Sequence, residues 1–377
     1  MQQITARRLI THTGEVAFPL VSVEDGKIVS IEQGPENGST ETLTSAFFEI
    51  HVHGAHSFDF MAADQEGIAE AGRFLATRGV AHYFPTTVTA PVDLTLQALE
   101  RLADAIERPR AHPSGAPVAL PVGIHMEGPF VSHGKRGVHP VASLREPSVE
   151  LFDRFQTAAR GNIRLMTLAP ELPHATELIQ HLTGNGVRVS MGHSMATEEE
   201  TLAGIAAGAG SSTHLFNAMR ALDHREPGIL GTVLDRGDIY AEMICDGVHV
   251  HPAVVRLWLR MKGEDRAILV TDGISATGMP DGRYRLGDME VEVKNGVCLS
   301  GETLAGSVLT MDRAVANVQR FTGTSLATAV RLASLNPARM MGMTHLTQMT
   351  PGSPANFNLF NQAGDHIGGF LAGRRVG

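Results

Sequence analysis

The sequence predicts an α/β protein: a (β/α)8 barrel of the TIM type with a small β-sandwich domain built from both chain ends. Two observations lead to this prediction. A strand-like apolar run followed by a helix-like segment recurs along the central part of the chain, and no low-complexity tract or linker divides it. At both ends of the chain, short apolar runs alternate instead with turn residues, as they do in small β units.

The eight strand candidates are short apolar runs, typical of buried parallel strands. They cover residues 46–52, 80–88, 118–127, 163–169, 188–193, 211–216, 240–246 and 267–272. Helix candidates between them include residues 64–78, 92–107, 174–184, 197–207 and 252–262. Thr197 and Glu200 form a capping-box pattern, and Pro252 stands where a helix favourably begins. Eight alternations over about 225 residues are what a (β/α)8 barrel requires.

Both chain ends are expected to pack together beside the barrel. Residues 1–45 carry the turn sequences EDG (24–26) and GP (34–35) between short apolar runs. Residues 350–377 contain strand candidates at 356–360 and 367–371. We therefore expect residues 1–45 and 350–377 to form the β-sandwich domain and residues 46–349 to form the barrel domain.

Composition is that of an ordinary globular enzyme and argues against several partners. Of the 377 residues, 43% are hydrophobic and 19% are charged, and the formal net charge is -9. This negative charge argues against general binding to nucleic acid or anionic membranes, and no run approaches the roughly 18 apolar residues of a membrane span. Two cysteines, Cys245 and Cys298, cannot form a disulfide framework, so we expect a cytoplasmic protein.

Side chains that can bind metal or transfer protons fall at the C-terminal ends of the strand candidates. They are His51, His53, Glu127, His193, His214 and Asp272. In a (β/α)8 barrel these strand ends meet at one mouth, so residues far apart in sequence become neighbours. A random scatter would place such residues as often at the opposite ends. The placement therefore predicts a polar site at the barrel mouth.

The first of these segments, His51-Val52-His53, can chelate an ion because residues two apart on a strand face the same side. On its own the pattern is weak evidence, since about one such pair in several is a metal site. Glu127 follows an apolar run, so its carboxylate is expected near the barrel interior, where it needs a partner. With 18 histidines and few cysteines, the sequence favours a divalent metal bound by imidazole and carboxylate.

A serine hydrolase is the alternative interpretation. Residues 192–196 (GHSMA) resemble a G-x-S-x-G nucleophile elbow with Ser194 as nucleophile, and Asp246 with His249 or His251 follows in the chain order of an α/β-hydrolase triad. The elbow lacks its final glycine, and the fold pattern is that of a barrel. Sensitivity to chelators with insensitivity to serine-directed reagents would distinguish the two classes.

Taken together, these segments resemble the N-acetylglucosamine-6-phosphate deacetylases of the amidohydrolase superfamily. The matching segments keep their order and spacing from about residue 46 to the C-terminus. They are 50–54 (IHVHG), 125–129 (HMEGP), 192–194 (GHS), 213–219 (THLFNAM), 225–228 (REPG), 246–249 (DGVH), 271–273 (TDG), 304–307 (LAGS) and 336–339 (NPAR). The resemblance implies removal of the acetyl group from an N-acetylamino-sugar 6-phosphate. It leaves open whether the sugar is glucosamine or galactosamine.

By this resemblance, Glu127, His193 and His214 hold the catalytic metal. Asp272 is the general base that takes a proton from water, and His139 polarises the amide carbonyl. These roles suit the residue types, because an acetamide is a poor electrophile that needs an activated water and a stabilised oxyanion.

The resemblance also implies a set of residues that bind the sugar phosphate, and a homodimer. The set is Val138, His139, Asn217, Ala218, Arg225, His249, Leu304, Ala305 and Gly306. Arg225 and His249 are expected to reach the phosphate across the dimer interface, and residues 304–306 to line the acetyl pocket.

The identity and number of metal ions remain open on the sequence alone. Zinc is expected, but imidazole and carboxylate ligands also suit iron, manganese or cobalt. Because His51 and His53 are both present, we predict a second, weaker metal site bridged to the first by Glu127. The alternative is a one-metal enzyme in which the pair binds water or Asp272. Glu171 occupies the position at which superfamily members with a carboxylated lysine need Lys, which argues against a dihydroorotase-like enzyme.

Overall fold

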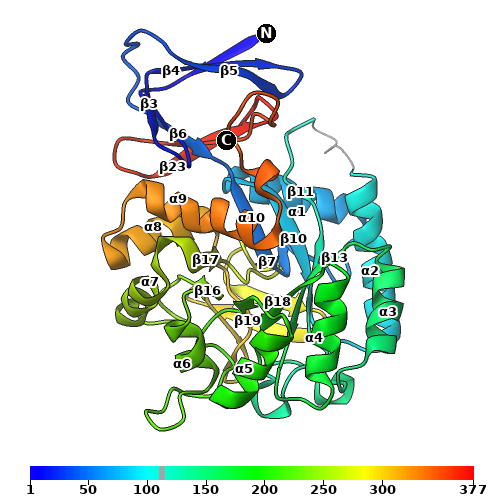
Figure 1. The fold of residues 1–377 in the computed structure, drawn as a ribbon. Helices are drawn as coiled ribbons and strands as arrows, with labels where there is room; N and C mark the ends of the chain where they lie inside the picture. Colours follow the sequence, from blue (N-terminus) through cyan, green and yellow to red (C-terminus); the bar gives the residue numbers. More distant parts are fainter. Residues whose placement is uncertain (110–114) are drawn as a thin grey trace.

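Eight parallel strands form a barrel at the centre of the structure, a computed structural model that describes residues 1–109 and 115–377 (Figure 1). The strands are β7 (Phe47–Val52), β10 (Val80–Thr87), β12 (Ile124–Glu127), β13 (Ile163–Leu168), β14 (Arg188–Met191), β15 (Ser211–Ser212), β16 (Tyr240–Ile244) and β17 (Ala267–Val270). A short strand, β11 (Leu120–Pro121), pairs with the start of β10. The predicted fold class and the order of its eight strands are thereby confirmed.

The first and last barrel strands meet through backbone contacts just beyond their ends. The amide of Asp272 donates to the carbonyl of His51 at 2.9 Å, and the amide of His53 donates to the carbonyl of Gly273 at 2.7 Å. Every residue of β7 and β10 is buried, which explains why apolar residues in these strands do not alternate with exposed polar ones.

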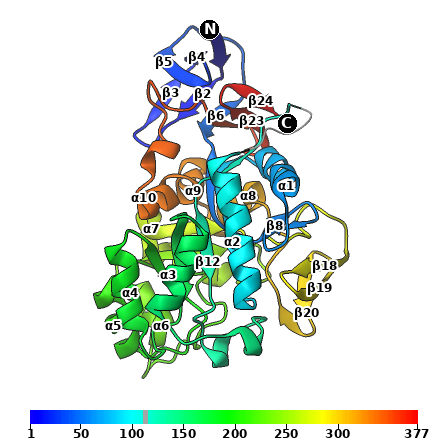
Figure 2. The same cartoon turned by 90° about the vertical axis from the view of Figure 1, so that its right-hand side faces the viewer.

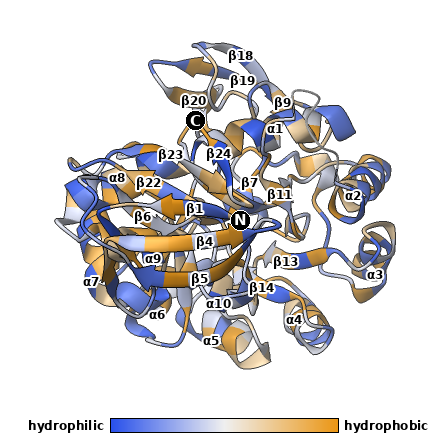
Figure 3. Ribbon diagram, turned by 90° about the horizontal axis from the view of Figure 1, so that it is seen from above, coloured by the Kyte–Doolittle hydropathy of each residue, from blue (hydrophilic) through white to orange (hydrophobic). Residues whose placement is uncertain are grey.

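Helices surround the barrel and connect its strands (Figures 1 and 2). They are α1 (Gln65–Thr77), α2 (Val92–Glu107), α3 (Val149–Ala158), α4 (Ala175–Gly184), α5 (Glu198–Ala207), α6 (Gly228–Asp235), α7 (Pro252–Arg266), α8 (Met311–Thr322), α9 (Leu326–Ala333) and α10 (Leu335–Met341). Seen from above, the surrounding helices carry both hydrophilic and hydrophobic residues (Figure 3), as expected of helices that pack one face on a sheet.

Local sequence signals explain where several helices begin. The capping box of Thr197 and Glu200 is present at the start of α5, where each side chain binds the other residue's backbone amide. Pro252 is the first residue of α7, as the sequence predicts. The predicted end of that helix at residue 262 coincides with a break, because Gly263 adopts a positive φ of 61° before the helical assignment continues to Arg266.

The two chain ends lie together at one end of the barrel (Figure 1). A three-stranded sheet contains β1 (Gln2–Thr5), β4 (Pro19–Glu24) and β5 (Lys27–Gln33). A six-stranded sheet combines strands of both ends, in the order β24 (Arg374–Val376), β23 (His366–Leu371), β22 (Phe357–Phe360), β6 (Thr42–Ser45), β2 (Arg8–Ile10) and β3 (Glu15–Ala17). Val21, Leu43 and Phe357 share a buried core in this unit. Domain limits at residues 45 and 350 stay a prediction.

The position of this unit follows from chain connectivity. Only Ala46 separates β6 of the six-stranded sheet from β7 of the barrel, so the sheets lie where β7 begins. The C-terminal strand ends, which carry the polar residues, therefore open on the opposite side of the barrel.

A small antiparallel sheet, not predicted from the sequence, is inserted after β17. It contains β18 (Gly282–Leu286), β19 (Met289–Lys294), β20 (Val297–Ser300) and β21 (Thr303–Leu304), and it projects beside the barrel (Figure 2). A two-stranded ribbon of β8 (Gly54–Ala55) and β9 (Phe58–Asp59) follows β7. The turn between β20 and β21 reaches the mouth of the barrel, so the inserted sheet contributes residues to the site there.

Two sequence expectations about the whole chain can be compared with the structure. None of the helices in the described parts of the chain is both long enough and apolar enough to cross a membrane. Cys245 and Cys298 are both buried and unpaired.

Candidate metal centre

The predicted site residues lie together at the C-terminal ends of the barrel strands. His51 and Glu127 belong to β7 and β12, whereas His193, His214 and Asp272 each lie two residues beyond the last residue of β14, β15 and β17. The strands are therefore shorter than predicted. The last three residues all have positive φ, at 50°, 26° and 52° respectively, a conformation uncommon for residues other than glycine. Such backbone strain occurs most often at functional sites.

Glu127 is the centre of the cluster and contacts five imidazoles. Its Oε1 lies 3.0 Å from Nε2 of His214, 3.2 Å from Nε2 of His193 and 3.6 Å from Nε2 of His51. Its Oε2 lies 3.3 Å from Nε2 of His53 and 3.6 Å from Nε2 of His139. Burial opposes the charge on Glu127, but the surrounding imidazoles outweigh it and hold the pKa of the carboxyl well below its usual range.

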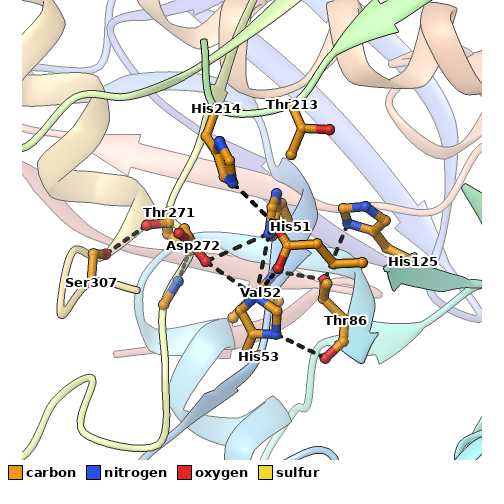
Figure 4. A network of polar contacts seen from close by, with 12 residues as sticks. His51, Val52, His53, Thr86, His125, Thr213, His214, Thr271, Asp272 and Ser307 are labelled. Carbon is orange, nitrogen blue, oxygen red and sulfur yellow. Dashed lines mark hydrogen bonds and ion pairs between the residues drawn. The ribbon is translucent and has the colours of Figure 1, made fainter. Parts of the chain in front are cut away.

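Asp272, like Glu127, contacts the pair of His51 and His53 (Figure 4). Its Oδ1 lies 3.2 Å from Nε2 of His53 and 3.5 Å from Nε2 of His51. Burial again opposes ionisation, yet these imidazoles lower the pKa of Asp272 to about 2. Its backbone is fixed from both sides, because its amide binds His51 and its carbonyl accepts from the amide of Ser307 at 2.8 Å. Asp272 is thus held as a carboxylate directly beside the His-x-His pair.

The donor set fits a divalent cation. Ligating atoms of His51, His53 and Glu127 lie within 4.8 Å of one another, as do those of Glu127, His139 and His193, and all of these residues are buried. Although burial disfavours a charged imidazole, Asp272 and Glu127 raise the pKa of His53 to about 10. The two carboxylates therefore favour positive charge in this buried site. Protons on the imidazoles can supply that charge, and so can a divalent cation bound by neutral imidazoles.

His139 lies at the edge of the cluster with its ring held in place. Its Nδ1 lies 2.6 Å from Oγ1 of Thr89, and its ring centroid is 4.6 Å from that of His193. Burial, with the neighbouring His193, lowers the pKa of His139 to about 4, so the ring is neutral near pH 7. Thr89 was not recognised from the sequence, because no local pattern links a threonine after one strand to a histidine far along the chain.

A cavity of about 800 Å³ opens over the cluster. Most of the predicted substrate residues line it, namely Val138, His139, Asn217, Ala218, His249, Leu304 and Gly306. Ala305 is buried behind this wall. The wall also contains residues that sequence reasoning missed, including His133, Lys135, Arg136, Phe216, Leu286 and Glu302. Leu286 and Glu302 come from the inserted sheet, which explains why no barrel pattern could reveal them.

Arg225 and His249 differ in their positions relative to this cavity. His249 lines it, and its Nδ1 lies 2.6 Å from Oδ2 of Asp246, which leaves Nε2 available to a ligand. Arg225 is exposed, and it is not among the described residues that line the cavity of its own chain. That Arg225 reaches a second protomer stays a prediction.

The geometry argues against Ser194 as a nucleophile. Ser194 is fully buried, and its hydroxyl donates to Oε2 of Glu171 at 2.7 Å and accepts from the amide of Ala196 at 3.0 Å. Among the described residues, no hydrogen bond joins Ser194 to His249 or to His251. Its hydroxyl is thus used in local structure.

Two buried glutamates near the cluster were not assigned any role from the sequence. Glu49 accepts hydrogen bonds from the amides of His51 and Thr271 at 3.0 and 3.1 Å, and so links β7 to the end of β17. Burial raises the pKa of Glu49 to about 8. Glu242 lies 3.4 Å from Nδ1 of His51. The only signal of Glu242 in the sequence was a charged residue among the apolar residues that form β16.

A (β/α)8 barrel with imidazole and carboxylate side chains at its mouth is typical of metal-dependent hydrolases. Comparison with known proteins identifies the family. Residues 42–376 match the amidohydrolase family, and the chain belongs to it. It is 37% identical to an N-acetylgalactosamine-6-phosphate deacetylase of Escherichia coli O157:H7, over 94% of this chain and 93% of that protein. It is also 37% identical to an N-acetylglucosamine-6-phosphate deacetylase of Lysinibacillus sphaericus, over 89% and 87% of the two chains.

A solved structure resembles the whole molecule. It is an aspartate-to-alanine mutant of N-acetyl-D-glucosamine-6-phosphate deacetylase from Mycobacterium smegmatis, in complex with N-acetyl-D-glucosamine-6-phosphate. The two structures superimpose with a TM-score of 0.93 at 32% identity, covering 100% of this chain and 99% of that chain.

Proposed function

We propose that this protein is a metal-dependent deacetylase that hydrolyses N-acetylglucosamine 6-phosphate to glucosamine 6-phosphate and acetate, in amino-sugar metabolism. The observation that carries the proposal is the cluster of Glu127, Asp272 and four imidazoles that line a cavity of about 800 Å³, with the imidazole of His51 buried against Glu127. Relatives similar over nearly the whole chain are deacetylases of such sugar phosphates.

Glu127, His193 and His214 would hold the catalytic cation, and His51 and His53 a second one. Such a cation, most simply zinc, lowers the pKa of a bound water from about 15.7 to about 7. Every other step can be assigned to side chains of this protein.

Asp272 moves the proton. Asp272 is a carboxylate at neutral pH, and its Oδ1 lies beside the His-x-His pair, where it can accept the proton of the attacking water. The same carboxyl can then return that proton to the departing amine nitrogen, which is otherwise a poor leaving group. The contacts that fix the Asp272 backbone hold the carboxyl in one position for both transfers.

His139 stabilises the oxyanion. Its Nδ1 is occupied by Thr89, so Nε2 is the nitrogen that faces Glu127 and the cavity. If the Thr89 hydroxyl donates to Nδ1, the imidazole proton lies on Nε2 and can be donated to the acetyl oxygen as negative charge develops there. Because the ring is neutral near pH 7, it brings no positive charge that would repel a cation beside Glu127.

The phosphate group is bound at the rim of the cavity. Asp246 fixes the ring of His249, whose free Nε2 can contact a phosphate oxygen, and Asn217 and Ala218 line the same wall. Leu304 to Gly306 would contact the acetyl group. Arg225 would complete this site in the partner subunit of a homodimer.

The position of Arg225 supports the homodimer. Arg225 is exposed and is not among the described residues that line the cavity of its own chain, as expected of a residue that acts in a partner subunit. Mixing Arg225→Ala protein with Asp272→Asn protein should then restore some activity, because one mouth of each hybrid dimer regains both intact groups.

The function is tested with a substrate panel. Release of acetate should be fast from N-acetylglucosamine 6-phosphate, slow from N-acetylglucosamine, and abolished by a chelator. Equal rates on the phosphorylated and unphosphorylated sugar would contradict the proposal, as would activity that survives complete metal removal.

A second candidate differs only in the sugar. The relative from Escherichia coli O157:H7 is an N-acetylgalactosamine-6-phosphate deacetylase with the same 37% identity. The two sugars differ in the orientation of one hydroxyl, so kcat/KM for both 6-phosphates in the panel distinguishes the candidates.

A further inference from the structure

Glu242 lies inside the barrel beneath the metal centre, where it cannot touch substrate. It belongs to β16, its side chain is fully buried, and it does not line the cavity. Its Oε2 lies 3.4 Å from Nδ1 of His51 and accepts from the backbone amide of His214 at 3.4 Å. Its Oε1 accepts from the hydroxyl of Ser190, also at 3.4 Å. Burying a carboxyl group that makes only such long contacts costs free energy. Its presence inside the barrel therefore points to a role beyond local structure.

The ring of His51 joins this carboxylate to the metal centre. Nε2 of His51 faces Asp272 and Glu127, whereas Nδ1 faces Glu242. Both oxygens of Glu242 already accept hydrogen bonds, from the amide of His214 and the hydroxyl of Ser190, so the proton of the contact with His51 belongs on Nδ1. The lone pair of Nε2 then points at the position where a cation would bind.

His51 differs from the other histidines of the cluster in the kind of group that fixes its ring. Nδ1 of His53 lies 3.2 Å from the backbone carbonyl of Thr86, and Nδ1 of His193 lies 2.9 Å from that of Lys135. Nδ1 of His214 has no hydrogen-bond partner among the described residues. His51 therefore differs from these three histidines in having a carboxyl oxygen, that of Glu242, beside its Nδ1.

A series of hydroxyl groups inside the barrel is oriented toward Glu242. The hydroxyl of Ser190 donates to Glu242, so its oxygen accepts from Thr213 at 2.7 Å. Thr213 in turn lies 2.7 Å from the hydroxyl of Thr167, which lies 2.8 Å from Nε2 of His125. Because the Thr213 proton points to Ser190, each further proton in this series must point the same way. These side chains come from different strands and hold one carboxylate in place.

We propose that Glu242 is a positioning residue that holds His51 as a ligand for the second cation. The inference deepens the proposed function, since it assigns to this metal site a carboxylate that lies outside the cavity. It concerns binding of the ion alone, so it can be tested without a substrate. Carboxylate partners of metal-binding histidines typically change metal affinity by roughly 10–100-fold when removed.

The test is a titration of metal-free protein with Co2+, followed by visible absorption, with metal content measured by elemental analysis. The parent should bind two equivalents. Glu242→Gln should raise the dissociation constant of the weaker equivalent by roughly 10–100-fold and that of the stronger one by less than about threefold. A parent that binds one equivalent, or a variant that binds both as the parent does, overturns the proposal.

Two controls separate a contact with the His51 ring from a general change of the barrel interior. Glu49→Gln alters another buried carboxyl group of the barrel, which accepts from backbone amides, that of His51 included, rather than facing an imidazole ring, and it should change the weaker equivalent by less than about threefold. In a His51→Gln background, adding Glu242→Gln should change metal binding by no more than about twofold, because the route through His51 is already lost. Equal losses in Glu49→Gln, or additive losses in the double variant, contradict a role through His51.

Circular dichroism and thermal unfolding of the metal-free proteins check that each variant is folded. Glu242→Met, similar in size, replaces the glutamine variant if that variant does not fold, with the same expected result. Failure of the proposed function would appear separately, as a parent that binds two equivalents through Glu242 but does not release acetate from sugar phosphates.

Discussion

Replacement of Asp272 by asparagine tests the centre of the proposed chemistry with a minimal change of shape. The side chain keeps its size, and the backbone contacts that fix the residue, to His51 and Ser307, do not involve the carboxyl group. We therefore expect Asp272→Asn to fold as the parent does. What it loses is the ability to accept a proton.

The expected loss of turnover follows from that chemistry. Removal of a positioned general acid–base group lowers turnover by typically 10²–10⁴-fold, which corresponds to about 3–5 kcal/mol of transition-state stabilisation. The carboxyl group that is lost lies within the cluster, where Oδ1 contacts both imidazoles of the His-x-His pair. Metal affinity should fall less than turnover, since Glu127 and the imidazoles remain.

The assay measures acetate release from N-acetylglucosamine 6-phosphate beside metal content and thermal stability. Asp59→Asn is the matched control, because Asp59 is also a buried carboxylate but binds the amides of Met61 and Gly287 outside the cluster. Its kcat should stay near that of the parent. A kcat for Asp272→Asn within about fivefold of the parent, in metal-loaded protein, would remove Asp272 from its role.

Three further predictions follow from other groups. His139→Gln should lower kcat by roughly 10²–10³-fold with a smaller change in KM, and a pure KM effect would refute oxyanion stabilisation. Arg225→Ala should weaken 6-phosphorylated substrates by roughly 10–100-fold and leave the slow reaction on N-acetylglucosamine unchanged; equal losses on both would show that Arg225 does not bind phosphate. Burial lowers the pKa of His82 from 6.5 to about 4. As pH falls, His82 therefore becomes protonated in the unfolded chain before it does so in the folded protein. The unfolding free energy that the neutral buried ring contributes is then lost as pH falls from about 6.5 toward 4. Between pH 7.5 and pH 5.0 the parent should lose about 2 kcal/mol more unfolding free energy than His82→Leu, as measured by urea denaturation, and an equal loss in both proteins would contradict this.

Much of the architecture could be read from local patterns, because each pattern has a local cause. Buried parallel strands are continuous apolar runs, and all eight runs are strands of the barrel. The capping box at Thr197 and the proline at 252 mark helix starts through contacts within a few residues. The inserted sheet was missed, since its short strands follow neither the apolar runs of the barrel nor a domain boundary.

By itself, the sequence determined that His51, Glu127 and Asp272 lie close together, because the parallel strands of a barrel end at one mouth. Only the tertiary structure decided how each side chain is held there. Glu242 faces Nδ1 of His51 and Thr89 faces Nδ1 of His139 across long sequence separations. Such pairings depend on the closure of the barrel, which brings different strands into contact, and no local pattern encodes that contact.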